Sequence, residues 1–166
     1  MRLMKVLKLS AFCAIALLII TPAQANEDDP LTRMFNWWNE AIATPGSLTE
    51  QAFLNYYTED VVLILNGKVS STGIAELTKS FQGIQANSQA VKIILPFEDL
   101  FIEGDRIFTH HFIYRHRDGI ESCLRAMGYA DLRDGKIARI HFVRVPYEPE
   151  GSVDQGCNDE MSVNSK

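Results

Sequence analysis

The chain has 166 residues, with 16 Lys and Arg against 21 Asp and Glu, and its pI is about 5.3. This acidic balance argues against nucleic acid and anionic membranes as partners, because both attract basic surfaces. The length fits one domain, and the sequence contains no internal repeat and no glycine-rich nucleotide-binding motif.

Residues 1–25 have the pattern of a secretory signal peptide. Three basic residues precede an apolar run that is short for a membrane span, and an Ala-x-Ala cleavage site ends at Ala25. We therefore expect export to the periplasm or the exterior, with a mature chain that begins at Asn26 and has no membrane partner. A retained membrane anchor is the alternative. After cleavage, 13 basic residues remain against 21 acidic ones, a formal charge of −8.

Three helices are predicted in the first half of the mature chain. Asp29 is an N-cap residue followed by Pro30, and apolar residues then recur at helical spacing until Pro45-Gly46. Ser47-Leu48-Thr49-Glu50 has the pattern of a capping box that starts a second, short helix. A third helix is expected after Thr72-Gly73, where apolar residues again form one stripe.

Strands are predicted in the rest of the domain. A continuous apolar strand from Val61 to Leu65 is followed by Asn66-Gly67 and a short return strand. A long strand from Val91 to Glu103, bent at Pro96, then leads into three strands between Arg106 and Val145.

Two Asp-Gly turns set which side chains share a face of the last three strands. Asp-Gly readily adopts the positive φ of tight hairpins, so a two-residue turn is expected at Asp118-Gly119. For the second turn we prefer a three-residue loop, Arg133-Asp134-Gly135, because it gathers small side chains over a cavity floor. A two-residue turn would instead bring Arg139, His141 and Val143 inward. In the preferred register the inner face carries His111, Ile113, Arg115, Ala126, Gly128, Ala130, Ile140, Phe142 and Arg144.

The opposite, outer face of these strands is amphipathic. Left uncovered, it would form an exposed apolar patch larger than soluble monomers usually carry, so we expect a homodimer through this face. Its side chains are Phe108, His110, Phe112, Tyr114, Met127, Tyr129 and Val143.

Two cysteines remain after signal cleavage, Cys123 in these strands and Cys157 near the end of the chain. Residues 147–166 are rich in Pro, Gly, Asp, Asn and Ser, which predicts a flexible tail. Because an exported chain meets an oxidising compartment, we expect one disulfide that ties this tail to the sheet. Two free thiols are the alternative.

The order of elements predicts an α+β domain over residues 26–146, with three N-terminal helices on one face of a strongly curved, mixed or antiparallel sheet. Four motifs resemble the nuclear transport factor 2-like (SnoaL-like) superfamily, and the resemblance spans residues 29–146. It implies a cone-shaped fold that hosts isomerases, dehydratases, cyclases, binding modules and oligomerisation domains. The motifs are Tyr57-Thr58-Glu59-Asp60-Val61-Val62, Asn66-Gly67, Thr72-Gly73 and Asp134-Gly135-Lys136-Ile137.

Within the superfamily, residues 133–136 and 140–144 look most like the association domain of calcium/calmodulin-dependent kinase II. Arg144 stands where that domain has a pocket arginine, whereas Gly128 falls where another would be. The superfamily's steroid isomerases place a catalytic base where this chain has Leu65 and a tyrosine where it has Trp37. The resemblance therefore does not extend to isomerase activity of that type.

Glu98 and His111 form the first candidate pair. A two-residue turn at Gly104-Asp105 places Glu98 on the inner face opposite His111, and a carboxylate beside an imidazole suits general acid/base catalysis. The register could also bring Asp99 inward. A structural ion pair is the alternative to a catalytic one.

Arg115 and Arg144 form the second candidate pair. Two guanidiniums in one cavity are costly to desolvate unless an anion pairs with them, and a forked guanidinium matches a carboxylate. Snorkelling to a wet rim or pairing with Glu98 is the alternative. The predicted ligand site also includes His111, Ile113, Gly128, Ile140, Phe142, Trp37 and Tyr57.

These residues favour an exported binding domain for a small anionic (carboxylate) or amphipathic molecule. A lyase, cyclase or isomerase that uses Glu98 and His111 is the first alternative, and an oligomerisation or protein-interaction domain is the second. We expect no cofactor and no metal, because the adjacent His110 and His111 point to opposite faces of one strand.

Overall fold

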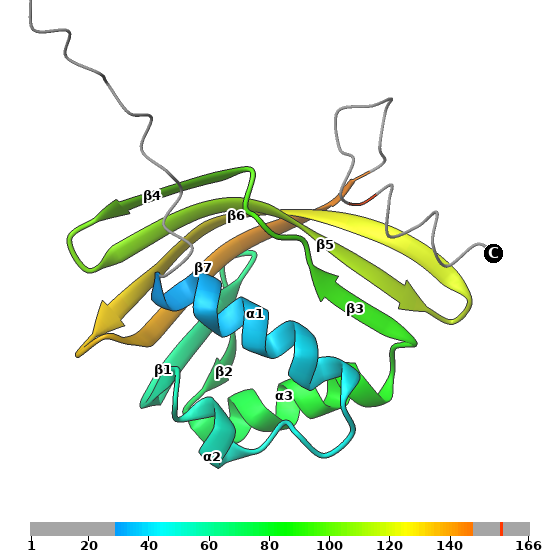
Figure 1. Cartoon of the computed structure of the whole chain (residues 1–166), viewed down its shortest axis with the longest axis horizontal. Coiled ribbons are helices and arrows are strands. Elements are labelled where there is room, and N and C mark those ends of the chain that lie inside the picture. The colour runs from blue at the N-terminus through cyan, green and yellow to red at the C-terminus, as the bar shows by residue number, and fades with distance from the viewer. Residues whose placement is uncertain (1–28, 148–156, 158–166) are drawn as a thin grey trace, which may run out of the picture.

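The computed structural model describes residues 29–147 and Cys157, so the predicted signal peptide and most of the predicted tail lie outside the described residues. Within that range, three helices lie beneath a curved sheet of seven strands (Figure 1). The helices are α1 (Pro30–Ala43), α2 (Glu50–Phe53) and α3 (Ile74–Ala86). The strands are β1 (Tyr57–Leu65), β2 (Lys68–Thr72), β3 (Ala90–Ile93), β4 (Asp99–Glu103), β5 (Arg106–Arg117), β6 (Ile120–Arg133) and β7 (Lys136–Tyr147).

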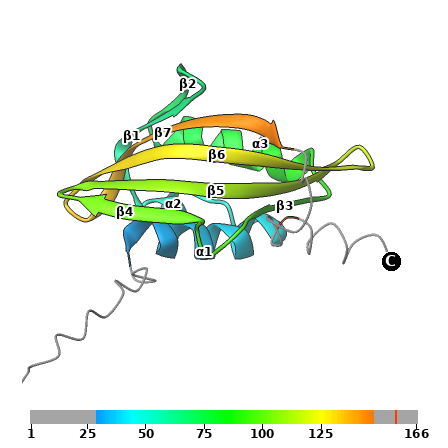
Figure 2. The same ribbon diagram turned by 90° about the horizontal axis from the view of Figure 1, so that it is seen from above.

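The sheet is mixed, and its strand order is β2-β1-β7-β6-β5-β3, with β4 also paired to β5. β1 runs parallel to β7, while the other pairs are antiparallel. Seen from above, β5, β6 and β7 lie side by side with the helices behind them (Figure 2). The prediction of an α+β fold with a curved mixed sheet is confirmed. No helix in the described range is long and apolar enough to cross a membrane.

The helix starts follow local capping chemistry. A carboxylate oxygen of Asp29 accepts hydrogen bonds from the backbone N–H groups of Leu31 and Thr32, as its N-cap position predicts. The capping box expected to begin at Ser47 is wrong. Thr49 caps α2 instead, while the Ser47 hydroxyl donates to carbonyl oxygens at the end of α1 and in the turn that follows it.

The long strand expected from Val91 to Glu103 is two strands, β3 and β4, which both pair with β5. Residues 94–98 belong to neither strand, although the backbone N–H of Ile94 still donates to the carbonyl oxygen of Phe112 on β5. Pro96 explains the break, because proline has no N–H to donate to a strand ladder. At the other end of the domain, Tyr147 still pairs with Cys123, so β7 extends one residue into the segment predicted as tail.

The inner face of the sheet has the predicted side chains. The first turn pairs Arg117 with Ile120, as expected. The three-residue loop preferred for the second turn is wrong, because this turn has two residues, Asp134 and Gly135, with φ of 53° and 73°. A β-bulge between Asp131 and Leu132 then shifts the register by one residue. The pairs Ala130↔Ile140, Gly128↔Phe142 and Ala126↔Arg144 therefore keep these residues on the predicted inner face.

Part of the outer face is covered within the chain. The predicted disulfide between Cys123 and Cys157 is present, and Cys157 packs with Phe112 and Tyr114, which are 2% and 1% exposed. These two aromatic side chains are therefore not free for a subunit partner, contrary to expectation. The remainder of the face exposes Met127 and Val143, each 53% accessible.

Candidate functional site

A cavity of about 180 Å³ lies between the helices and the inner face of the sheet. Apolar and aromatic side chains from α1, α3, β1, β3, β5 and β7 make up most of its wall. The predicted ligand residues that line it are Tyr57, His111, Ile113, Ile140, Phe142 and Arg144.

A second hollow of about 350 Å³ adjoins this cavity and forms its mouth. The two share Ile84, Ile113 and Arg144 in their walls, and the mouth adds Arg115 and Arg117. The site is therefore an apolar interior behind a cationic entrance.

Arg144 stands where interior and mouth meet. Its backbone N–H donates to the side-chain oxygen of Asn66 at 2.6 Å, and the Asn66 amide donates to its carbonyl oxygen at 3.1 Å. Asn66 belongs to the β1–β2 turn and has a φ of 51°, a conformation that asparagine tolerates well. The predicted Asn-Gly hairpin thus holds the backbone of this arginine in place.

The guanidinium groups of Arg115 and Arg144 lack carboxylate partners among the described residues. The Nε–H group of each is buried and has no hydrogen-bond acceptor within that range. Burial lowers the pKa of Arg144, and the neighbouring charge of Arg115 lowers it further. Because these two positive charges repel each other, the binding of an anion beside them would be favourable.

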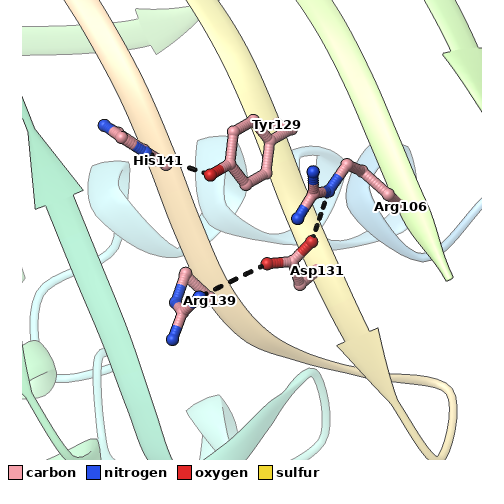
Figure 3. Close-up of polar contacts among 5 residues, drawn as sticks. All are labelled: Arg106, Tyr129, Asp131, Arg139 and His141. Carbon is pink, nitrogen blue, oxygen red and sulfur yellow. Dashed lines mark hydrogen bonds and ion pairs between the residues drawn. The ribbon is translucent and has the colours of Figure 1, made fainter.

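A polar cluster on the outer face shows the opposite arrangement (Figure 3). The Asp131 carboxylate receives the Nε–H of Arg106 at 2.6 Å and lies 3.8 Å from Arg139. The Arg106 guanidinium stacks 4.0 Å from the centre of the Tyr129 ring, and the Tyr129 hydroxyl pairs with Nδ1 of His141 at 3.2 Å. Arg106 and Arg139 share the Asp131 carboxylate, so their charges are partly neutralised within the protein and do not require an anionic ligand.

His111 lies on β5 at the wall of the cavity and is 1% exposed. Its Nδ1 is 3.2 Å from the hydroxyl oxygen of Thr109, and its ring packs against Phe35, Phe97 and Phe142. Burial lowers the pKa of His111 to about 3, with a smaller contribution from His110. The imidazole is therefore neutral at physiological pH.

The structure does not bring Glu98 to His111. Glu98 is exposed and lies outside the strands, just before β4, while Nε2 of His111 has no partner among the described residues. Asp99 also fails to point inward, because it pairs across from His110 and reaches Nδ1 of that residue at 3.1 Å. The expected acid/base pair is therefore wrong.

Another predicted site residue, Trp37, lies elsewhere. Trp37 stacks on Tyr56 at 4.8 Å and meets Phe53 edge-on, away from the cavity, whereas Trp38 lines it. Trp38 belongs to the apolar stripe of α1, so helical periodicity was the signal that could have selected it.

Gly128 does not form an open floor of the cavity, contrary to the prediction from its small size. A Cβ atom at this position would lie 2.0 Å from the carbonyl oxygen of His141 and 2.7 Å from the Phe142 ring. The side chain of Phe142 fills the space that the small residues of β6 leave. Within the described residues, no group of three or more His, Cys, Asp or Glu side chains could hold a metal ion.

Comparisons with known proteins identify the fold. No protein-family model matches the chain, and no curated protein matches it. Among solved structures, an NTF2-like protein of unknown function from Exiguobacterium sp. 255-15 is 18% identical, with a TM-score of 0.57 over 72% of this chain and 99% of that one. A candidate SnoaL-like polyketide cyclase from Jannaschia sp. CCS1 is 13% identical, with a TM-score of 0.56 over 69% and 82%.

A third structure, a protein with a ketosteroid isomerase-like fold from Catenulispora acidiphila, was determined in complex with trimethylamine. It is 14% identical, with a TM-score of 0.51 over 73% of this chain and 88% of that one. At such identities the likeness is one of fold alone. The chain has the nuclear transport factor 2-like fold.

Proposed function

We propose that this chain is an exported domain that binds a small carboxylate with an apolar body. The observation that carries the proposal is Arg144, a partly buried arginine without a carboxylate partner in the described range, at the junction of apolar cavity and cationic mouth. The pattern of residues 1–25 and the disulfide both support export. The catalytic alternative loses its support, because Glu98 does not reach His111.

The geometry suits an amphipathic acid. A carboxylate at the mouth can accept charged hydrogen bonds from Arg144 and Arg115, while the apolar body contacts Ile113, Ile140 and Phe142 in the interior. Binding would also relieve the repulsion between the two guanidiniums. Such an ion pair weakens as salt rises, because dissolved ions screen the charges at the mouth.

Replacing Arg144 by Lys keeps the charge but loses the forked donor geometry. We expect the affinity for phenylpropanoate to fall about tenfold or more, since a charged hydrogen bond is worth about 1.5–3 kcal/mol. Isothermal titration calorimetry at two salt concentrations measures this. Arg139→Lys, in the outer polar cluster, is the matched control and should bind as the wild type does. Unchanged affinity in Arg144→Lys, or wild-type binding of uncharged analogues only, would contradict the anion pocket.

We further propose that the protein is a homodimer through the uncovered part of its outer face. This proposal is supported by Met127, Val143 and Val145, which are 53%, 53% and 48% exposed on adjacent strands. Val143→Glu is expected to shift the dimer to monomer at micromolar concentration in analytical ultracentrifugation, by placing unpaired charges in the interface. Val69→Glu, which changes an even more exposed valine on β2, should leave the dimer intact. A monomeric wild type refutes this proposal.

A further inference from the structure

Besides Nε of Arg144 at the mouth, two buried polar atoms in the cavity wall have no partner in the described part of the chain. They are Nε1 of Trp38 and Nε2 of His111. Both residues line the cavity, and they are 3% and 1% exposed. Buried polar groups in native proteins are nearly always hydrogen-bonded, so each such atom calls for an explanation.

The chemistry of these atoms restricts what can pair with them. An indole N–H can only donate, so the partner of Trp38 must offer an acceptor. The neutral imidazole of His111 carries a donor on one nitrogen and an acceptor on the other, depending on its tautomer. Thr109 occupies Nδ1, and the rings of Phe35, Phe97 and Phe142 surround the imidazole.

Apart from Arg144 at the mouth, the other polar residues of the wall are Ser70 and Ser80, which carry no charge, and Tyr57, which is already engaged. The hydroxyl of Tyr57 donates to the sulfur of Met34 at 3.1 Å, and burial raises the pKa of Tyr57 well above its ordinary value. Neither Tyr57 nor His111 therefore brings a charge into the interior at physiological pH. A charged group at the inner end of a ligand would find no counterion there.

We propose that the ligand carries an uncharged oxygen, a hydroxyl or a carbonyl, on the end that enters the cavity, where it bonds to Trp38 and His111. This inference rests on the proposed binding function and names its ligand class. The size of the interior narrows it further, since an apolar cavity of about 150 Å³ holds one benzene molecule. An interior of about 180 Å³ therefore takes one aromatic ring with a small substituent. The class is that of hydroxyaryl or acylaryl carboxylic acids.

Two matched pairs of probes test this class by titration calorimetry. The neutral pair is para-ethylphenol and ethylbenzene, and the acidic pair is para-hydroxyphenylpropanoate and phenylpropanoate. In each pair the members differ only in the oxygen. The variants Trp38→Phe and His111→Phe remove one polar group each and keep an aromatic ring. Trp37→Phe and His141→Phe make the same changes outside the cavity and are the controls.

The hydroxyl should raise wild-type affinity about threefold to tenfold in both pairs, as one net hydrogen bond does. This preference should disappear in Trp38→Phe and in His111→Phe and persist in both controls. A wild type without the preference, binding of neither phenol at millimolar concentration, or a preference unchanged in both cavity variants would overturn the inference. Far-UV circular dichroism and thermal unfolding verify that each variant is folded, and the wild-type comparison needs no variant.

The two pairs also separate this inference from the proposed function. If phenylpropanoate binds no more tightly than ethylbenzene, the anion pocket is wrong, while a preference for para-ethylphenol still supports the inner oxygen site. If phenylpropanoate binds through Arg144 but neither hydroxyl adds affinity, the anion pocket stands and the inner oxygen site is wrong.

Discussion

Gly128→Ala is expected to lower the free energy of unfolding by about 3 kcal/mol or more. The added Cβ would lie 2.0 Å from the carbonyl oxygen of His141 and 2.9 Å from Cα of Phe142, and both are backbone atoms. A flexible side chain can rotate away from such a contact, but two hydrogen-bonded strands must separate. The φ of +153° at Gly128 adds strain for any other residue. Denaturant unfolding followed by circular dichroism measures the loss.

Gly83→Ala provides the control for this change. Gly83 lies within α3, and a Cβ there would meet nothing within 4 Å. Alanine should therefore be neutral or stabilise the helix by up to about 1 kcal/mol. A Gly128→Ala protein as stable as the wild type would show that β6 and β7 can separate at little cost. The expected instability also means that a larger residue at Gly128 cannot serve as a simple plug for the cavity.

Removing the disulfide by Cys123→Ala and Cys157→Ala together should cost about 3–4 kcal/mol of stability, according to the chain-entropy model for its closed loop. Phe112 and Tyr114 would also lose the cover that Cys157 gives them. Thermal and denaturant unfolding of the variant and of the reduced wild type should agree. Ligand affinity should change little, because the disulfide lies on the outer face and the cavity on the inner one. Two alkylatable thiols in unreduced, exported protein would contradict this prediction.

Turn chemistry carried much of what the sequence could predict about the sheet. Asp118-Gly119 gave the correct register of β5 and β6, and from it the inner positions of His111, Ile113 and Arg115. The inner-face residues of β7 were predicted correctly, although the turn that precedes the strand was predicted wrongly. A three-residue loop and a two-residue turn followed by a bulge each add one residue to one strand, so both give the same alternation. Nothing local in the sequence distinguishes them.

The predictions that failed depend on contacts between distant segments. Glu98 was assigned as if the strand were continuous, but the break at Pro96 frees the residues before β4 from the sheet's alternation. Helical periodicity places Trp38 rather than Trp37 on the buried stripe of α1, but only the packing of α1 against the sheet shows that this stripe lines the cavity. Phe112 was expected in a subunit interface, because the residue that covers it, Cys157, lies far along the chain.

The parallel pairing of β1 with β7 has a consequence for the order in which the domain folds. Tyr57, at the start of the first strand, pairs with Ile137, near the start of the last. The edge of β1 that faces away from β2 therefore stays unpaired until β7 becomes available. Pairing of β1 with β7 has to bring together segments that are remote in sequence. Contacts of this kind form slowly and leave strand edges exposed in the meantime. The ligand site is completed in the same folding step, because β7 contributes Ile140, Phe142 and Arg144 to the cavity wall.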